Sequence, residues 1–351
     1  MQEQKFLTID IGSAWSKAFL VSVDSENKLE VEKSSRLPTS WGDLPYVIGE
    51  LKKKISAEKL QTIYVSHLPE VEAIAAKEKV DFVSEKDAAE ALAKFFKKSD
   101  SFLTILDGGA SNLHENIEPE TIGKFLTFQS SSIFLENFFG KRRFRAHILP
   151  TDTKELEIEE AFLRSIFQNK FTDTPVNKKL LVLVTGGVLS GSPRLSRLAL
   201  LILDTLGSDV TAQILFDREF FLPCFGALLA KYKQVHMVTT GSWLEDLGAF
   251  ISLGDSKKIE LDWGFSQVQQ VELSDGEISL IPAPKEQKIK LSVFLSKKEK
   301  KEHTINGGNL GIVLDARSRP LPLTFGQADS RNLMSKWFKE LEQAEINKEV
   351  F

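Results

Sequence analysis

Two nearly identical strand-like stretches occur in this chain of 351 residues, and their aspartates, Asp10 and Asp107, lie 97 residues apart. The first stretch is FLTIDIG at 6–12, and the second is FLTILDGG at 102–109. Each is a short apolar run that ends at an aspartate and a glycine, which is typical of a buried strand entering a tight turn. A repeat at this spacing indicates two similar halves, so the sequence predicts a duplicated α/β fold.

The first stretch carries the groups that a phosphate site needs. Gly12 lets the backbone approach a phosphate closely, and turn N–H groups such as that of Ser13 can surround an anion. Lys17, early in the next strand, would add a positive charge beside the phosphates. Asp10 would hold the waters of a phosphate-bound Mg²⁺, a cation that keeps much of its hydration. For this stretch alone, an ordinary hairpin with a polar turn is the alternative.

The second stretch repeats the Asp-x-Gly form of the first. Asp107 is followed directly by Gly108 and Gly109, and Ser111 adds a hydroxyl. The run at 122–129 is expected to be the next strand of this half. Two such units facing each other would clamp one phosphate chain, so ATP with Mg²⁺ is expected to bind between the halves.

A third glycine turn follows the buried-strand run LLVLVT, where Gly186 and Gly187 end the strand. Ser192 and Pro193 are expected to begin the next helix as N-cap and first residue. Here too bare backbone can meet a ligand. A helix–sheet crossover that needs small residues explains this turn equally well.

Composition excludes several classes of protein. The formal net charge of -4 gives no global field toward nucleic acid, and no apolar run reaches the roughly 18 residues that a membrane span requires. The single cysteine, Cys224, rules out an internal disulfide and fits a reducing compartment, so we expect a cytoplasmic protein. Cys224 lies in an apolar helix pattern and is interpreted as a small core residue.

The three glycine turns resemble the nucleotide-binding segments of the actin, sugar-kinase and heat-shock-chaperone ATPase superfamily. Asp10-Ile11-Gly12-Ser13 with Lys17 resembles its first phosphate segment, Asp107–Ser111 the second, and Thr185-Gly186-Gly187 the adenosine segment. The resemblance implies a duplicated actin-like, ribonuclease-H-like ATPase fold. It also implies ATP and Mg²⁺ as cofactors, with Asp10 and Asp107 as the carboxylates near the metal.

Within that superfamily the chain resembles the MutL-type accessory proteins of glutamate mutase. The match lies in DIGSAWSK, FLTILDGGAS, TGGVLSGSPR with the following FDREFFLP, and GGNLGIVLDARSRPL, of which the last is the most specific. It implies a protein that assembles or reactivates a cobalamin-dependent mutase, its client, through nucleotide-linked closure of two lobes. The alternative is a non-hydrolysing actin-like scaffold of a pilus or cell-division type, whose tail helix recruits a partner. Sugar or acetate kinase activity is weaker, because no acceptor-side base can be named.

The second segment departs from the family pattern. Asn112, Leu113 and His114 stand where the family has hydroxyls and a carboxylate, and the family's inserted domain before this segment is missing. Asp107 is then the remaining candidate catalytic carboxylate. We therefore expect ATP binding with at most slow hydrolysis, and the sequence leaves open whether the protein is an enzyme.

The sequence divides into four expected parts. These are a first actin-like half over 1–98, a second half with the adenosine segment over 99–255, a β-rich region over 256–326, and an amphipathic tail helix over 327–351. In the β-rich region, the SDG run at 274–276 is expected to form a hairpin turn. The tail helix has one apolar face, and it is expected either to fold back on the body or to dock on a partner.

Overall fold

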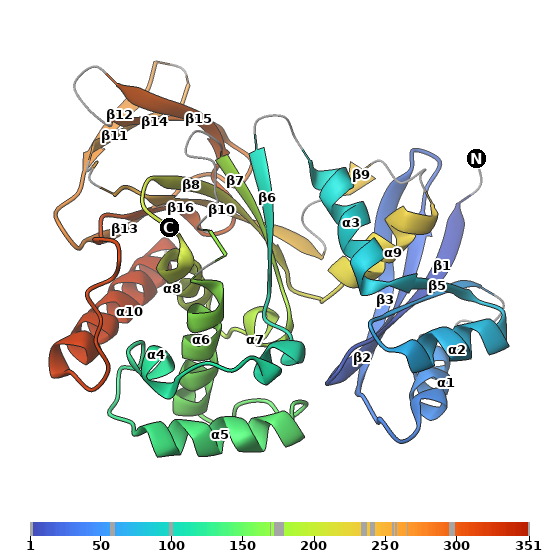
Figure 1. Ribbon diagram of the computed structural model, residues 1–351. Helices are drawn as coiled ribbons and strands as arrows, with labels where there is room; N and C mark the ends of the chain where they lie inside the picture. The colour runs from blue at the N-terminus through green and yellow to red at the C-terminus, as the bar shows by residue number, and fades with distance from the viewer. Residues whose placement is uncertain are drawn as a thin grey trace. The chain divides into compact units, whose positions relative to one another are not determined.

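The computed structural model describes residues 3–56, 60–97, 101–168, 170–171, 179–232, 237–238, 243–254, 256, 258–264, 266–294 and 299–349. They form two compact units (Figure 1). Unit 1 comprises Met1–Lys97, Phe144–Leu149 and Asp217–Leu244, and unit 2 comprises Lys98–Arg143, Pro150–Phe216 and Glu245–Phe351. The α/β fold class with a β-rich C-terminal region is confirmed. The four-part division stays a prediction, since its boundary residues 98, 99 and 255 lie outside the described residues.

The sheet of unit 1 has β1 at its centre, in the order β5-β4-β1-β2-β3-β9. β1 pairs antiparallel with β2 and parallel with β4, and β4 pairs parallel with β5. The strand–turn–strand predicted for residues 6–23 is therefore confirmed. The strands are β1 (Gln4–Ile11), β2 (Trp15–Val23), β3 (Lys28–Pro38), β4 (Gln61–Ser66), β5 (Asp81–Ser84) and β9 (Met237–Val238).

Apolar side chains cover both faces of this sheet. On one face, Ile9 belongs to a cluster that includes Leu51 of helix α1. Elsewhere in the unit the core is aromatic, since Phe19 packs on Phe221, whose ring lies 4.8 Å from that of Trp243. The helices are α1 (Leu44–Ile55), α2 (Pro69–Glu78), α3 (Glu85–Phe96) and α9 (Leu222–Lys231).

Unit 2 contains a six-stranded sheet in the order β13-β16-β10-β8-β7-β6, in which β6, β7 and β8 run parallel. A second sheet, β12-β11-β14-β15, shares a hydrophobic cluster with β10 and β16. The strands are β6 (Ser101–Asp107), β7 (Lys179–Thr185), β8 (Val210–Asp217), β10 (Leu244–Ser252), β11 (Lys258–Asp262), β12 (Val268–Glu272), β13 (Ile278–Ile281), β14 (Lys288–Phe294), β15 (Lys300–Asn306) and β16 (Gly311–Asp315). The helices are the 3₁₀ helix η1 (Ala110–His114), α4 (Pro119–Gly123), α5 (Ser132–Phe144), α6 (Thr153–Phe167), α7 (Gly187–Ser190), α8 (Leu195–Thr205) and α10 (Ala328–Glu349).

The predicted strand over 122–129 is wrong. Pro119 instead begins the short helix α4, and Ile122, Phe125 and Leu126 are all buried. Ile122 lies in this helix, whereas Phe125 and Leu126 follow it in a turn, where their N–H groups donate to the carbonyls of Ile122 and Gly123. Periodicity over so short an apolar run does not distinguish a strand from the end of a helix. Consequently β6 is an edge strand that pairs parallel with β7, and in the described residues it forms no antiparallel hairpin like that of β1 and β2.

Two further predictions, the hairpin at 274–276 and the helix start at Ser192 and Pro193, are wrong because residues distant in the sequence determine the local structure. Gly276 does form a turn with positive φ, but β12 and β13 on either side of it belong to different sheets, so the SDG run makes no hairpin. Helix α8 begins at Leu195 rather than at Pro193. The backbone N–H groups of Leu195 and Ser196 donate to the carboxylate of Glu345 in α10, at 3.1 Å each. Because this cap comes from 150 residues away, no local pattern reveals it.

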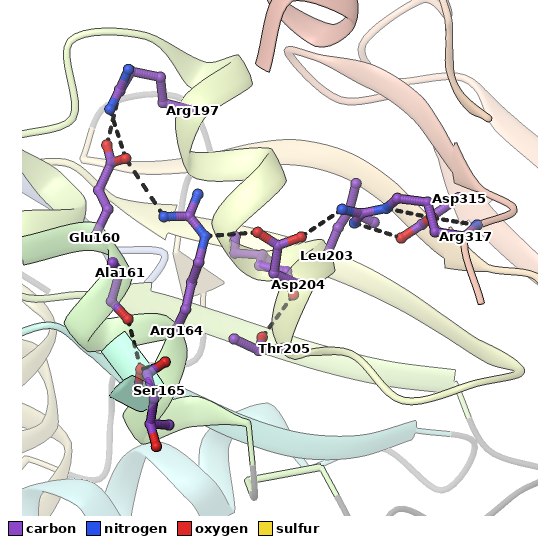
Figure 2. A network of polar contacts seen from close by, with 12 residues as sticks. Glu160, Ala161, Arg164, Ser165, Arg197, Leu203, Asp204, Thr205, Asp315 and Arg317 are labelled. Carbon is purple, nitrogen blue, oxygen red and sulfur yellow. Dashed lines mark hydrogen bonds and ion pairs between the residues drawn. The ribbon is translucent and has the colours of Figure 1, made fainter. Parts of the chain in front are cut away.

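A buried set of charges, which we call the arginine network, joins the helices of unit 2 to the end of β16 (Figure 2). The carboxylate of Asp204 in α8 accepts hydrogen bonds from Arg164 of α6 and from Arg317, both at 2.7 Å. All three side chains are fully buried. Arg317 also donates two hydrogen bonds to Asp315. Burial alone would raise the pKa of Asp315, but Arg317 and Arg319 hold it below its ordinary value.

The tail helix α10 covers this network. Trp337 is buried and its ring centre lies 4.5 Å from the Arg317 guanidinium, while Phe338 lies beneath Arg197, which forms a bidentate pair with Glu160. Helix α10 contacts α8 and β13. Of the two expectations for the tail, folding back on the body is confirmed. Docking on a partner through this apolar face gains no support, because Met334, Trp337 and Leu341 are already buried.

We expect Asp204→Ala to lower the free energy of unfolding by about 3–5 kcal/mol, because it leaves two buried guanidinium groups without their shared carboxylate. Urea denaturation followed by circular dichroism measures the change. Lys300→Ala is the matched control, since it breaks an exposed ion pair with Glu302 and should leave stability nearly unchanged. Equal losses in the two variants would contradict the structural role of the network.

Candidate functional site

The turn between β1 and β2 has its shape fixed by side chains from outside it. The hydroxyl of Thr39 donates to the carbonyl of Gly12 at 2.8 Å, and the indole N–H of Trp41 donates to the carbonyl of Ser13 at 3.1 Å. A Cβ atom at Gly12 would lie only 2.9 Å from the carbonyl oxygen of Trp15. The turn is therefore close-packed and organised before any ligand binds.

The structure brings Asp10 and Lys17 together beside this turn. They are opposite residues in the β1–β2 register, and the Lys17 ammonium lies 2.6 Å from an Asp10 carboxylate oxygen. The Asp10 side chain is 3 % exposed and that of Lys17 is 14 % exposed. Burial raises the pKa of Asp10, and Lys17 opposes that rise. The Asp10 carboxylate and the Lys17 ammonium are thus already paired with each other. A phosphate that binds Lys17, or a hydrated cation that binds Asp10, would have to share that partner.

A second polar chain ends at the same turn. The hydroxyl of Ser13 lies 3.3 Å from Nε2 of His67, and Nδ1 of His67 lies 3.0 Å from a carboxylate oxygen of Glu85. The hydrogen bond to Glu85 raises the pKa of His67. Sequence analysis missed both His67 and Glu85. Each follows the carboxyl end of a strand parallel to β1, namely β4 and β5, and such ends meet at one sheet edge.

In unit 2 the two glycine turns contact each other. Asp107 of β6 pairs with Thr185 of β7, and the N–H of Gly108 donates to the carbonyl of Thr185 at 2.8 Å. Gly186 has φ +96°, and a Cβ atom there would lie 2.4 Å from both Asp107 Oδ1 and the Gly108 nitrogen. Only glycine fits at this buried crossing, so the two turns pack backbone against backbone, and Gly187 then begins α7.

The residues that depart from the family pattern have structural roles in this turn. Asn112 donates from its amide to the carbonyls of Asp107 and Gly109, at 2.6 and 3.0 Å, and Leu113 is buried. The Asp107 carboxylate is exposed, and its Oδ1 accepts from the N–H of Gly109 at 2.8 Å. Ser111 is exposed as well. The amide that replaces a family hydroxyl therefore shapes the turn rather than facing a ligand.

The predicted site residues thus form two sets, one in each unit. Unit 1 holds Asp10, Gly12, Ser13 and Lys17, and unit 2 holds the residues of the two glycine turns. Within the described ranges, no group of three or more histidine, cysteine, aspartate or glutamate side chains could hold a metal ion by itself. Carboxylate oxygens at Asp10 and Asp107 suit Mg²⁺, which binds through one or two carboxylates plus phosphate oxygens and water.

Comparisons with known proteins give similar solved structures at low identity and no family. A scan of protein-family models and a search of curated proteins found no match. Among solved structures, the 2-hydroxyglutaryl-CoA dehydratase component A of Acidaminococcus fermentans is 16 % identical, with 67 % of this chain and 100 % of that chain covered and a TM-score of 0.37. The ethanolamine utilization protein EutJ of Carboxydothermus hydrogenoformans is also 16 % identical, with 65 % of this chain and 89 % of that chain covered and a TM-score of 0.39.

A third similar structure is the activator of 2-hydroxyisocaproyl-CoA dehydratase from Clostridium difficile with bound ADPNP, at 11 % identity, 68 % and 100 % coverage and a TM-score of 0.35. At such identities the likeness concerns the fold alone. The finer resemblance to glutamate-mutase accessory proteins stays a prediction. In the described part of the chain, no helix is long and apolar enough to cross a membrane.

The titration of His67 tests the polar chain of unit 1. In NMR titrations of the imidazole, we expect a pKa above the ordinary 6.5, falling toward that value in Glu85→Gln. A raised native pKa means that the His67 contribution to stability is present at low pH and is lost as the pH rises through that pKa. Glu90→Gln, on the exposed side of the same helix, is the control. An unshifted His67 in the unmodified protein would contradict the Glu85 contact.

Proposed function

We propose that this chain is an ATP-binding, actin-like accessory protein that acts on a protein client. The observation that carries the proposal is the fixed turn of unit 1, where Gly12 and Ser13 follow a buried strand and Asp10 and Lys17 lie beside them. A backbone turn without Cβ hindrance, a hydroxyl and an ammonium are the groups that bind phosphates in proteins. Asp10 then has the role of ordering waters around Mg²⁺.

The glycine turns of unit 2 support the same proposal. Gly186 and Gly108 pack backbone against backbone, so the two turns hold each other in place. In the proposal, Gly108, Gly109 and Ser111 contact phosphate, and Gly186 with Gly187 contacts the adenosine. Asp107 is the exposed carboxylate of this turn, and its proposed role is to order a metal-bound water.

The proposed client is a cobalamin-dependent mutase, which this chain would assemble or reactivate. This part of the proposal rests on the resemblance to glutamate-mutase accessory proteins. The most family-specific stretch, GGNLGIVLDARSRPL, contributes Asp315, Arg317 and Arg319 to the buried arginine network, so the role of these three residues is to hold unit 2 together. The rival scaffold hypothesis relied on recruitment by the tail helix. The apolar face of α10 is buried in unit 2, which disfavours that rival.

We expect ATP with Mg²⁺ to raise the melting temperature. Ligand bound to the native state adds RT ln(1 + [L]/Kd), about 2.7 kcal/mol at a hundredfold excess over Kd. Differential scanning fluorimetry with ATP, ADP and Mg²⁺ measures the shift. Gly186→Ala should abolish most of it, because the new Cβ displaces Asp107 or Gly108.

Gly276→Ala is the matched control for that variant. It also replaces a glycine of positive φ in unit 2, but a Cβ there meets open space, and it lies in a turn outside the proposed site. Both variants place alanine at a positive φ, but only the Cβ at position 186 meets other atoms, so only Gly186→Ala should lose the ATP response. An unmodified protein that shows no shift at millimolar nucleotide would contradict the proposed function.

We expect phosphate release from ATP to be very slow or absent. Loss of one well-placed transition-state contact costs about 10²–10³ in rate, and the second segment lacks the family's hydroxyls and carboxylate. A single-turnover assay of phosphate release checks this, with the protein alone and with a purified cobalamin-dependent mutase. Rapid release by the protein alone that is lost in Asp107→Asn would overturn the prediction.

A further inference from the structure

Ser13, His67 and Glu85 form a serine–histidine–carboxylate chain, of which the proposed ATP site uses only Ser13. The serine hydroxyl lies 3.3 Å from Nε2 of the imidazole, and the other ring nitrogen lies 3.0 Å from the carboxylate. This is the order of contacts that activates a serine nucleophile, in which the imidazole accepts the hydroxyl proton and the carboxylate orients the ring. In sequence the three residues are far apart, and the ends of β1, β4 and β5 bring them together.

We propose that Ser13 is a phosphoryl acceptor, and that this chain transfers the γ-phosphoryl group of ATP to its own Ser13 hydroxyl. The proposal rests on the proposed ATP binding at the same turn. It adds a covalent step that nucleotide binding alone does not require. His67 is the proposed general base, and Glu85 is a positioning residue that acts through His67.

The surroundings of the chain fit this role. The side chains of His67 and Glu85 are 39 % and 44 % exposed, so a ligand can reach the chain from solvent. The ammonium of Lys17 lies in the same hairpin, where it can offset the negative charge of an approaching phosphate. Phosphoryl transfer relies mainly on positioning and charge, and the fixed turn provides positioning.

The transfer balances without any further reagent. The Ser13 oxygen forms a bond to the γ-phosphorus, and the bond from that phosphorus to the oxygen bridging the β- and γ-phosphates breaks. ADP leaves with the bonding electron pair, and the serine proton passes to Nε2 of His67. The products are phosphoserine and ADP. Inorganic phosphate is not released, so slow phosphate release and self-phosphorylation are compatible.

The test incubates the purified full chain with γ-³²P-labelled ATP and Mg²⁺, followed by intact-mass and peptide mass spectrometry. We expect one acid-stable phosphoryl group per chain, located on Ser13. Ser13→Ala should abolish the label. Ser40→Ala, which removes an exposed serine of a neighbouring loop, should keep it. Label on another residue, or an acid-labile label on His67, would overturn the proposal.

The initial rate of labelling tests the base. We expect His67→Gln to lower it by about 10²–10⁴-fold, the usual contribution of a general base. His147→Gln, an exposed histidine outside the site, should leave the rate unchanged. Circular dichroism and the melting temperature verify that each variant is folded. A folded His67→Gln protein that labels at the parent rate would remove His67 from the mechanism.

The role of Glu85 is tested by the pH profile of labelling. Only neutral imidazole accepts a proton, so the rate should rise with pH through the raised pKa of His67. Glu85 and Asp10 both favour the charged imidazole, while Lys17 pairs with Asp10. Glu85→Gln should therefore shift the midpoint to lower pH as well as reduce the rate. A lower rate with an unmoved midpoint would contradict the positioning role.

The two proposals can fail separately. Absence of any ATP-dependent melting shift in the unmodified protein contradicts the proposed function itself. A clear shift without label on Ser13, after long incubation at a pH above the His67 pKa, leaves ATP binding in place and overturns phosphoryl transfer.

Discussion

The interaction on which unit 2 depends is the carboxylate of Asp204 between two buried guanidinium groups. Charges removed from water are tolerated only when opposite charges and hydrogen bonds replace the solvent, so Arg164 and Arg317 must reach Asp204 together. That requirement fixes α6, α8 and the end of β16 relative to one another within the unit. Helix α8 follows the turn that contains Gly186, so the same network also anchors the chain beside the glycine crossing.

Unit 1 separates the groups that hold its turn from those available for chemistry. Thr39 and Trp41 bond to backbone carbonyls of the turn, so they fix its path without engaging its side chains. The Ser13 hydroxyl contacts His67, and the buried Asp10–Lys17 ion pair lies beside the turn. This division lets the turn remain rigid while its polar side chains change partners when a ligand binds.

Sequence reasoning worked where a structure is encoded locally. The buried strands β1 and β7 each have an apolar strand pattern, and Asp10, Gly12, Ser13 and Lys17 lie within one hairpin. It failed where a partner is distant. His67 and Glu85 reach Ser13 only through the order of parallel strands. The apolar run at 122–129, which ends helix α4 and continues as a turn, is too short for its periodicity to identify a strand.

Because Glu345 caps α8, the start of α8 can be completed only late in synthesis. Domains generally begin to fold from the N-terminal side while the ribosome is still adding residues. Helix α8 emerges 150 residues before the carboxylate that satisfies its first N–H groups. Until α10 is synthesised, the start of α8 lacks its cap. The side of the arginine network that Trp337 and Phe338 cover is then open to water. A nascent chain paused before α10 would therefore be recognisable to proteases as incomplete, whereas unit 1 draws its last segments from residues up to 244.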